Sequence, residues 1–247
     1  MADVSVALIE ARALGKRFDN GAVALTGLSL SIEAGRVVAV TGPSGSGKTT
    51  FFRLCNGSIR PTAGELTVLG VSMGGARGAE LRGLRRRVAI VYQNHNLVPS
   101  LSVLQNVLIG RLGSVSLARA IRRSLVPTDD ERRAIYDLLD ALGIADKLYT
   151  RAEDLSGGQQ QRVAIARAFA QDPQLLLADE PVASVDADTA KAILELIART
   201  SRERGVTALV SLHQGEYVER YCDRHIELRH GELVRDIELA RPMEVAR

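Results

Sequence analysis

The sequence predicts an α/β fold in which a mostly parallel sheet is joined by an N-terminal antiparallel β subdomain and an inserted α-helical subdomain. In the second half of the chain, apolar runs such as 175–178 alternate with helix-capable segments such as 189–203, which is typical of a parallel sheet with helices on both faces. The opening instead shows short alternating strands at 6–9 and 28–32, as in an antiparallel sheet with one covered face. Helical spacing of apolar residues dominates from about 94 to 155.

Composition and charge limit the possible classes of protein. A chain of 247 residues, 46% hydrophobic and 25% charged, has the make-up of an ordinary globular protein with a sizeable core. A net charge of +3 is too weak to indicate nucleic acid, and none is expected as a partner. The basic clusters 82–87 and 119–123 are explained better by solvated helix faces than by a binding patch. Cys55 and Cys222 make no metal or redox motif.

Nothing in the sequence predicts a signal peptide or a membrane span. The N-terminus carries the acidic Asp3 and lacks a positive region followed by a long apolar core. No window approaches 18 uninterrupted apolar residues. We therefore expect any membrane role to come through a partner.

The elements of the first half are placed by apolar runs and turn residues. A strand at 37–40 leads into a glycine-rich stretch, and the helix after it is expected over 48–56. A turn at 61–64 precedes a strand at 65–69, and the mostly apolar run 88–92 is typical of a buried strand.

The second half contains clear helix boundaries. Thr128, followed by three acidic residues, predicts a helix start, and Gly143 predicts a stop. A further helix is expected over 158–170. The tail at 223–236 is expected to be a hairpin that turns at His230-Gly231.

The glycine-rich stretch 42–49 fits the pattern G-x-x-x-x-G-K-[ST] between a strand and a helix. Its glycines let backbone N–H groups point inward at phosphate oxygens, and the following helix adds its positive end. Lys48 is expected to reach the β- and γ-phosphates, and Thr49 to ligate Mg²⁺. The nucleotide-binding residues expected here are Gly42, Pro43, Ser44, Gly45, Ser46, Gly47, Lys48, Thr49 and Thr50. The chain is thus predicted to have a P-loop NTPase core that binds a nucleoside triphosphate and Mg²⁺.

Two carboxylates, Asp179 and Glu180, follow the apolar strand 175–178. Because ligands gather at the carboxyl ends of parallel strands, both are expected near the phosphate loop. Asp179 is predicted to bind Mg²⁺ through water, and Glu180 to orient or deprotonate the attacking water. A pair of acids at a loop start is the plain alternative, and the phosphate loop upstream argues against it.

The string Leu155-Ser156-Gly157-Gly158-Gln159-Gln160-Gln161-Arg162 is the second decisive motif. Ser156 is a natural N-cap, and the glycines leave the helix N-terminus open for an anion. With a phosphate loop upstream and Asp-Glu downstream, this string resembles the signature of ATP-binding cassette (ABC) ATPases. The resemblance implies a single ABC ATPase domain over 5–240, with the helical subdomain inserted at 94–155.

Four more residues take their expected roles from this resemblance. Gln93 matches the glutamine loop, which implies a contact with Mg²⁺ and water that senses a transmembrane partner. His213 matches the switch histidine at the γ-phosphate, and Asp186 lies in a loop that crosses between two subunits. Phe18 stands where the family stacks an aromatic side chain on adenine, although a simple core position is an alternative.

The resemblance also implies partners. In the family, ATP lies between the phosphate loop of one subunit and the signature of another, so a head-to-tail dimer is expected, with Ser156, Gly157, Gly158 and Gln159 completing the partner's site. Transmembrane permease subunits are expected to dock on 94–155, and a periplasmic or lipoprotein substrate-binding protein to act through the permease. The chain is accordingly expected at the cytoplasmic face of the inner membrane as a peripheral subunit.

The transported cargo is indicated by more local strings. Segments 96–98, 101–113, 178–184 and 212–214, and the loop-rich insertion 114–130, resemble the ATP-binding subunits of phosphonate importers. Val185 and Ala187 depart from the usual family residues without touching a catalytic group. ATP-driven uptake of phosphonates or related phosphorus oxyanions is therefore the leading hypothesis.

Three alternatives remain open. The chain could energise an importer or exporter for another cargo. A soluble ABC ATPase acting on ribosomes or DNA is disfavoured, because such proteins usually carry two cassettes or a long coiled-coil insertion. A non-catalytic binding module is disfavoured by the presence of both Lys48 and Glu180.

Overall fold

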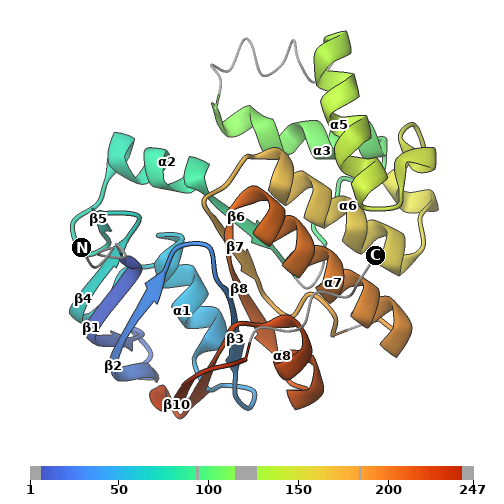
Figure 1. Cartoon of the computed structure of the whole chain (residues 1–247). Helices are drawn as coiled ribbons and strands as arrows, with labels where there is room; N and C mark the ends of the chain where they lie inside the picture. The colour runs from blue at the N-terminus through green and yellow to red at the C-terminus, as the bar shows by residue number, and fades with distance from the viewer. Residues whose placement is uncertain (1–6, 93–94, 115–126, 184, 241–247) are drawn as a thin grey trace, which may run out of the picture.

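A computed structural model describes residues 7–92, 95–114, 127–183 and 185–240. Its centre is a six-stranded sheet with strand order β10-β9-β3-β8-β7-β6 (Figure 1). All neighbouring strands are parallel except β9 and β10. The strands are β3 (Val37–Thr41), β6 (Val88–Val91), β7 (Leu175–Ala178), β8 (Thr207–Leu212), β9 (Arg224–Arg229) and β10 (Glu232–Glu238). The carboxyl ends of the parallel strands consequently share one edge.

A second sheet of four antiparallel strands has the order β2-β1-β4-β5. Its members are β1 (Ala7–Arg17), β2 (Val23–Glu33), β4 (Ala63–Val68) and β5 (Val71–Ser72). The first two strands are longer than predicted. The β1–β2 register shifts several times, and Ala13 has a positive φ of 47°. Such irregularities interrupt the alternation of apolar and polar residues on which the prediction depended.

The helices cover both faces of the central sheet (Figure 1). They are α1 (Lys48–Cys55), α2 (Gly78–Arg87), α3 (Val103–Arg111), α5 (Asp129–Ala141), α6 (Gly157–Ala170), α7 (Ala187–Arg204) and α8 (Gly215–Tyr221), with short 3₁₀ turns at Leu112–Ser114, Ala145–Lys147 and Ala152–Asp154. Helix α3 and helix α5 follow β6 in the chain and pack on α6. The limits 94–155 for an inserted subdomain stay a prediction.

Helices α2 and α8 were not predicted as such. Helix α2 buries only Leu84 and is otherwise rich in arginine, so it carries no clear apolar stripe. Helix α8 spans seven residues, too few for a periodic signal. The basic cluster 82–87 does lie on a helix, with Arg82 and Arg86 exposed. The cluster 119–123 lies outside the described residues.

Two hydrophobic cores lie on opposite faces of the central sheet. Val37 and Ala39 of β3 face the core that contains α6 and α7, whereas Val38 and Val40 face the core that contains α1 and the antiparallel sheet. Alternation along a strand sends neighbouring side chains to opposite faces. The helix after the phosphate loop and the helix after the signature are therefore separated by the sheet.

Helix ends follow the predicted chemistry. Thr128 caps α5 with a reciprocal capping box to Glu131, and Gly143 adopts the left-handed conformation after the helix. Ser102 and Ser156 cap α3 and α6 in the same way. Each such cap stabilises its helix by about 1 kcal/mol.

The C-terminal hairpin forms as predicted, with a positive φ at both His230 and Gly231. Its first strand also pairs in parallel with β3, which the sequence pattern did not indicate. Within the described residues, no helix combines the length and apolarity that crossing a bilayer requires. The predicted fold class, a P-loop α/β core with a second antiparallel sheet and added helices, is confirmed.

Candidate functional site

The phosphate loop runs from the end of β3 to the start of α1. The Lys48 amine is buried and donates hydrogen bonds to the carbonyl oxygens of Gly42 (2.8 Å) and Pro43 (3.2 Å). Burial lowers the pKa of Lys48, and the carboxylates of Glu180 and Asp179 offset part of that shift. Because carbonyls and not carboxylates hold the amine, its charge is available to an anion.

The loop has the shape of a phosphate cradle. Gly42 and Gly47 adopt φ values of 141° and 107°, and a Cβ on Gly42 would lie 2.1 Å from the Leu228 carbonyl oxygen. Only glycine fits such positions. The Ser46 hydroxyl is buried with no protein hydrogen-bond partner among the described residues. An unpaired buried hydroxyl in the same loop as a buried amine is a group that a bound phosphate would satisfy.

The other loop residues are placed for solvent or ligand contact. Pro43, Ser44, Gly45 and Thr49 are exposed, and Thr50 is half-buried in the first turn of α1. Among the described residues, no three His, Cys, Asp or Glu side chains form a cluster that could hold a metal ion alone. Mg²⁺ at phosphates commonly takes only one or two protein ligands, so Thr49 and Asp179 fit that requirement.

The two carboxylates lie at the end of β7, next to β8 in the sheet. The Ser211 hydroxyl of β8 donates to Asp179 Oδ1 (3.0 Å) and accepts from the Glu180 N–H (2.6 Å). Glu180 has a left-handed backbone, with φ at 50°. A non-glycine residue keeps that conformation only where its surroundings enforce it, and such strain is concentrated at functional sites.

His213 follows β8 directly and meets Glu180. Its Nε2 lies 2.8 Å from Glu180 Oε1, at hydrogen-bond distance. The structure thus brings Lys48, Asp179, Glu180 and His213 to one edge of the sheet, on three neighbouring strands. A fixed carboxylate beside an imidazole and a buried amine can orient a water and stabilise developing negative charge on a phosphate.

The predicted signature residues lie at the start of α6. Ser156 is an exposed N-cap that accepts from the Gln159 N–H (3.4 Å), while Gln159 Oε1 accepts from the Ser156 N–H (2.9 Å). Gly157 has open space where a Cβ would stand. A Cβ on Gly158, however, would lie 2.8 Å from Thr189 Cγ2. Gly158 therefore allows a close approach of α6 to α7, a packing role that the sequence did not indicate.

Asp186 is the N-cap of α7 and lies beside the same helix end. Its carboxylate accepts from the Thr189 N–H (3.0 Å) and hydroxyl (2.7 Å). These bonds hold the pKa of Asp186 below its ordinary value. Since Thr189 also packs on Gly158, the starts of α6 and α7 form one exposed surface.

This surface is not joined to the phosphate loop of the same chain. In the part of the chain that the structure describes, no hydrogen bond or ion pair links 42–49 to 156–159 or to Asp186. The two groups lie at the N-terminal ends of helices on opposite faces of the sheet, α1 for the phosphate loop and α6 and α7 for the exposed surface.

Phe18 lies just after β1 and is half-buried, outside both hydrophobic cores of the described residues. The Lys16 ammonium lies 5.3 Å from its ring centroid. Its contact with adenine stays a prediction. Gln93, predicted to meet Mg²⁺, lies outside the described residues.

Two site residues escaped the sequence reading. Ser211 joins both carboxylates, yet it resembles any strand serine in the sequence. Gly231 donates its N–H to the Ser46 carbonyl (3.1 Å) and accepts from the Thr26 N–H (2.9 Å), so the C-terminal hairpin supports the phosphate loop. The turn was foreseen, but its position depends on the pairing of β9 with β3.

The fold and this site define an ATPase with a phosphate-binding loop, and residues 25–183 match the family model described as ABC transporter. The chain belongs to this family, whose members bind and hydrolyse ATP. Among the curated proteins it is similar to the phosphonates import ATP-binding protein PhnC 2 of Oceanobacillus iheyensis, with 42% identity over 93% of this chain and 89% of the relative. The PhnC proteins of Frankia casuarinae and Nitratidesulfovibrio vulgaris are 46% and 44% identical, each over 90% of this chain and over 86% and 83% of the relative.

Solved structures of ATP-binding cassettes are also similar to this chain. The dimeric, post-hydrolysis form of the ATP-binding cassette MJ0796 bound to ADP and Pi matches with a TM-score of 0.75 and 31% identity, covering 94% of this chain and 99% of that one. CbiO1 of Clostridium perfringens, part of the ABC transporter complex cbiONQ, matches with a TM-score of 0.82 and 28% identity over 94% of this chain and 88% of that one.

Proposed function

We propose that this chain is the ATP-hydrolysing subunit of an importer for phosphonates or related phosphorus oxyanions. The observation that carries the proposal is the similarity to proteins named as phosphonate import ATP-binding proteins, at 42–46% identity over at least nine-tenths of the chain. The site supports the ATPase part, because the buried Lys48 and the paired Asp179 and Glu180 meet at one edge of the sheet.

Each site residue has a role in this proposal. Lys48 and the loop N–H groups hold the β- and γ-phosphates, and Phe18 stacks on adenine. Thr49, Asp179 and Gln93 would hold Mg²⁺. The bound ion would neutralise part of the negative charge on the phosphates. Glu180 orients the attacking water and accepts its proton, with Ser211 fixing the carboxylate pair. His213 steadies Glu180 and contacts the γ-phosphate.

The complete site is proposed to need two copies of the chain. Ser156, Gly157, Gly158 and Gln159 of one copy, with Asp186, cover the ATP on the phosphate loop of the other. This arrangement is supported by the placement of the two groups on opposite faces of one sheet, and by the dimeric form of the related cassette MJ0796.

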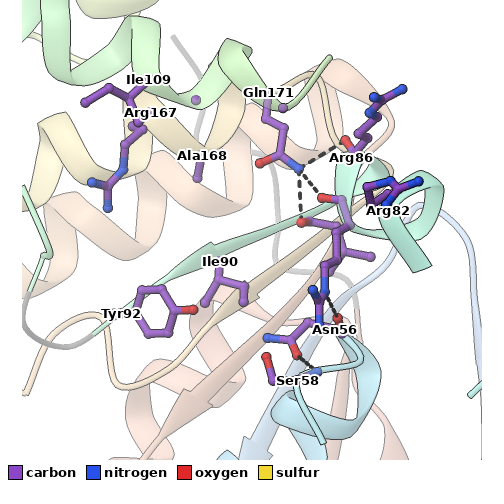
Figure 2. A pocket seen from close by; sticks show the side chains of 14 residues that line it. Asn56, Ser58, Arg82, Arg86, Ile90, Tyr92, Ile109, Arg167, Ala168 and Gln171 are labelled. Carbon is purple, nitrogen blue, oxygen red and sulfur yellow. Dashed lines mark hydrogen bonds between the residues drawn. The ribbon is translucent and has the colours of Figure 1, made fainter. Parts of the chain in front are cut away.

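A groove between α2, β6 and the added helices offers a docking place for the permease (Figure 2). Its volume is about 550 Å³. Three exposed arginines of α2, Arg82, Arg85 and Arg86, line one side of it. The apolar lining residues include Val88, Ile90, Tyr92, Ile109 and Ala168. We propose that an amphipathic permease segment docks here, with acidic side chains facing Arg82 and Arg86.

This docking proposal has a direct test. The pair Arg82→Glu and Arg86→Glu should abolish stimulation of ATPase activity by the permease and leave the basal rate within about twofold, because exposed charges steer docking. Charge reversal at Arg204 and Arg220, two exposed residues of α7 and α8 that lie outside both the groove and the segment 94–155, is the control. Unchanged stimulation in the α2 variant would remove this groove from the docking surface.

In this proposal the chain works at the cytoplasmic face of the inner membrane, and a substrate-binding protein delivers cargo through the permease. The cargo is tested with the full complex reconstituted in lipid vesicles. A binding protein loaded with methylphosphonate should stimulate ATP hydrolysis, whereas the same protein offered sulfate should not. A matched complex carrying Lys48→Ala reports the background rate. Stimulation by an unrelated solute, with none by phosphonate, would overturn the cargo and leave the ATPase assignment standing.

A further inference from the structure

The turn between β9 and β10 lies between the phosphate loop and the antiparallel sheet. Gly231, the second residue of this turn, is buried, although the residues on either side of it are exposed. Its N–H donates to the Ser46 carbonyl (3.1 Å), and its own carbonyl accepts from the Thr26 N–H of β2 (2.9 Å). Both backbone polar groups of Gly231 therefore bond to other segments, one to the phosphate loop and one to the second sheet.

Only glycine fits at this position. Gly231 has a φ of 80°, and a Cβ on it would lie 2.7 Å from the Ala24 carbonyl oxygen and 2.9 Å from Leu25 Cα. Gly47 of the phosphate loop meets the same strand, because a Cβ on it would lie 2.6 Å from that Ala24 oxygen. The turn, the loop and the start of β2 thus touch through backbone atoms, which leaves the loop little room to shift.

The hairpin that carries this turn is itself held in place. Strand β9 pairs in parallel with β3 up to Thr41, the residue before the loop, and His225 Nε2 lies 2.7 Å from Thr41 Oγ1. Arg224 makes two hydrogen bonds of 2.7 Å to the Asp236 carboxylate across the hairpin and donates to the Ser31 carbonyl (2.6 Å) of β2. Figure 1 shows the red hairpin reaching β2. A bidentate ion pair and two neighbouring strands make the hairpin a fixed support for the loop.

The bond to Ser46 determines the direction of the next N–H group. The peptide bond between Ser46 and Gly47 is trans and planar, so its C=O and N–H point in opposite directions. With the Ser46 carbonyl bonded to Gly231, the Gly47 N–H points away from the hairpin. Within the described part of the chain this N–H makes no hydrogen bond. It is an available donor of the kind that a phosphate loop presents to an anion.

We infer that Gly231 is a positioning residue for nucleotide binding: by holding the Ser46 carbonyl, it directs the Gly47 N–H at the phosphates. A rotated 46–47 peptide would turn a carbonyl oxygen toward the phosphates, and the two negative groups would repel each other. Gly231 lies outside the residues 25–183 that match the family model. The inference rests on the proposed role of the loop 42–49 and is independent of the cargo.

The first test is the affinity of Gly231→Ala for nucleotides. The added Cβ has no room beside β2, so the turn must move and release the Ser46 carbonyl. Competition against a fluorescent ATP analogue gives Kd for ATP, ADP and adenosine. Kd for ATP and ADP should rise about tenfold, because one charge-assisted hydrogen bond is lost. Adenosine has no phosphate, so its Kd should stay within about twofold. In turnover, KM should rise about tenfold with kcat within about threefold.

Two variants provide matched controls. Gly64 is also left-handed, with φ at 67°, and a Cβ on it would lie 2.1 Å from the Ala13 carbonyl oxygen within the antiparallel sheet. Gly64→Ala should therefore strain the fold and leave Kd for ATP within about twofold. His230→Asn keeps the turn, because Asn-Gly suits two consecutive left-handed residues, and should bind ATP as the wild type does. Equal rises in both glycine variants, or a rise that includes adenosine, would show that Gly231 only stabilises the fold.

Hydrogen exchange in the wild-type chain tests the bond without any substitution. If the Gly231 N–H positions the loop, a ligand that needs the positioned loop must in turn hold that N–H, because coupling between two sites is reciprocal. Saturating ADP with Mg²⁺ should slow exchange of the Gly231 amide at least about fivefold, as followed by NMR. The Gly143 amide, bonded to the Asp140 carbonyl (2.8 Å) after α5, should exchange at an unchanged rate. Unchanged exchange at Gly231 would overturn the inference even if its variant did not fold.

The proposed ATPase function is measured separately in the same binding assay. ATP binding by the wild type and its loss in Lys48→Ala support the phosphate loop, whatever Gly231→Ala does. Wild-type affinity in Gly231→Ala would overturn the inference alone. A wild-type chain that does not bind ATP, or a Lys48→Ala chain that binds it equally well, would overturn the proposed role of the loop and the inference with it.

Discussion

The carboxyl edge of the central sheet and the exposed start of α6 and α7 differ in how their polar groups are satisfied. At the sheet edge, Asp179, Glu180, Ser211 and His213 are bonded to one another across neighbouring strands. At the helix starts, the hydrogen bonds of Ser156 and Asp186 within the described part of the chain lie in their own first turns. In the proposed function, the first region is a connected catalytic half-site, while the second is a preformed surface that acts on the nucleotide of a partner copy.

The difference explains why one chain holds all the motifs and still lacks a closed site. Residues that perform chemistry must be fixed relative to one another, and adjacent parallel strands do that well. A surface that must bind and release a partner copy is better kept exposed and locally satisfied. ATP-driven closure can then be a population shift between separated and joined copies.

The largest effect is expected from removing the base at the sheet edge. Glu180→Gln preserves the shape and the N–H bond to Ser211, but takes away the proton acceptor. Hydrolysis should fall at least about a hundredfold, while ATP binding persists and traps the dimer. Phosphate release and gel filtration with ATP measure both effects. Glu216→Gln, on the exposed first turn of α8, is the control. Turnover equal to wild type would exclude Glu180 as the base.

A complementation experiment tests whether the second region belongs to the partner's site. Lys48→Ala disables the phosphate loop, and Gly157→Asp places a charge in the open space at the start of α6. Each variant alone should be inactive, yet a mixture restores one intact composite site per mixed dimer. ATP hydrolysis should rise about tenfold above either variant alone. A mixture no faster than its parts would contradict the shared site.

A smaller loss is expected when the link between the carboxylates is removed. Ser211→Ala leaves Asp179 and the Glu180 N–H without their common partner and lets the left-handed turn relax. We expect kcat to fall about tenfold, with a small change in KM. The buried Ser201, whose hydroxyl has no hydrogen-bond partner among the described residues, provides the control Ser201→Ala. If both variants turn over ATP equally fast, Ser211 does not position the pair.

The smallest expected effect is on the free energy of unfolding, and it differs between Gly157 and Gly158 of the signature. Gly158→Ala puts a Cβ against Thr189 Cγ2 and should lower the free energy of unfolding by about 1–3 kcal/mol. Gly157→Ala meets open space and should be neutral or stabilise by up to about 1 kcal/mol. Urea unfolding of both variants gives the comparison. Equal stabilities would mean that the helix starts do not pack closely.

Much of the site was predictable because its motifs are short stretches of consecutive residues. The phosphate loop needs glycines and a lysine at fixed spacing, and α6 needs a serine cap with Gln159 three residues later. Helix α2 and the long irregular β1 were missed, since arginine-rich or bulged segments lack a clean period. The roles of the individual site residues, including Phe18, Gln93 and Asp186, stay predictions.

The sequence by itself indicated the class of protein and its nucleotide, and it predicted the residues that hold the nucleotide, because each motif is a local pattern with its own physical reason. Only the tertiary structure decided that Gly231 supports Ser46 and that Ser211 joins the two carboxylates. These contacts join residues far apart in the chain. They depend on strand order and helix packing, which cannot be predicted from a short stretch of sequence.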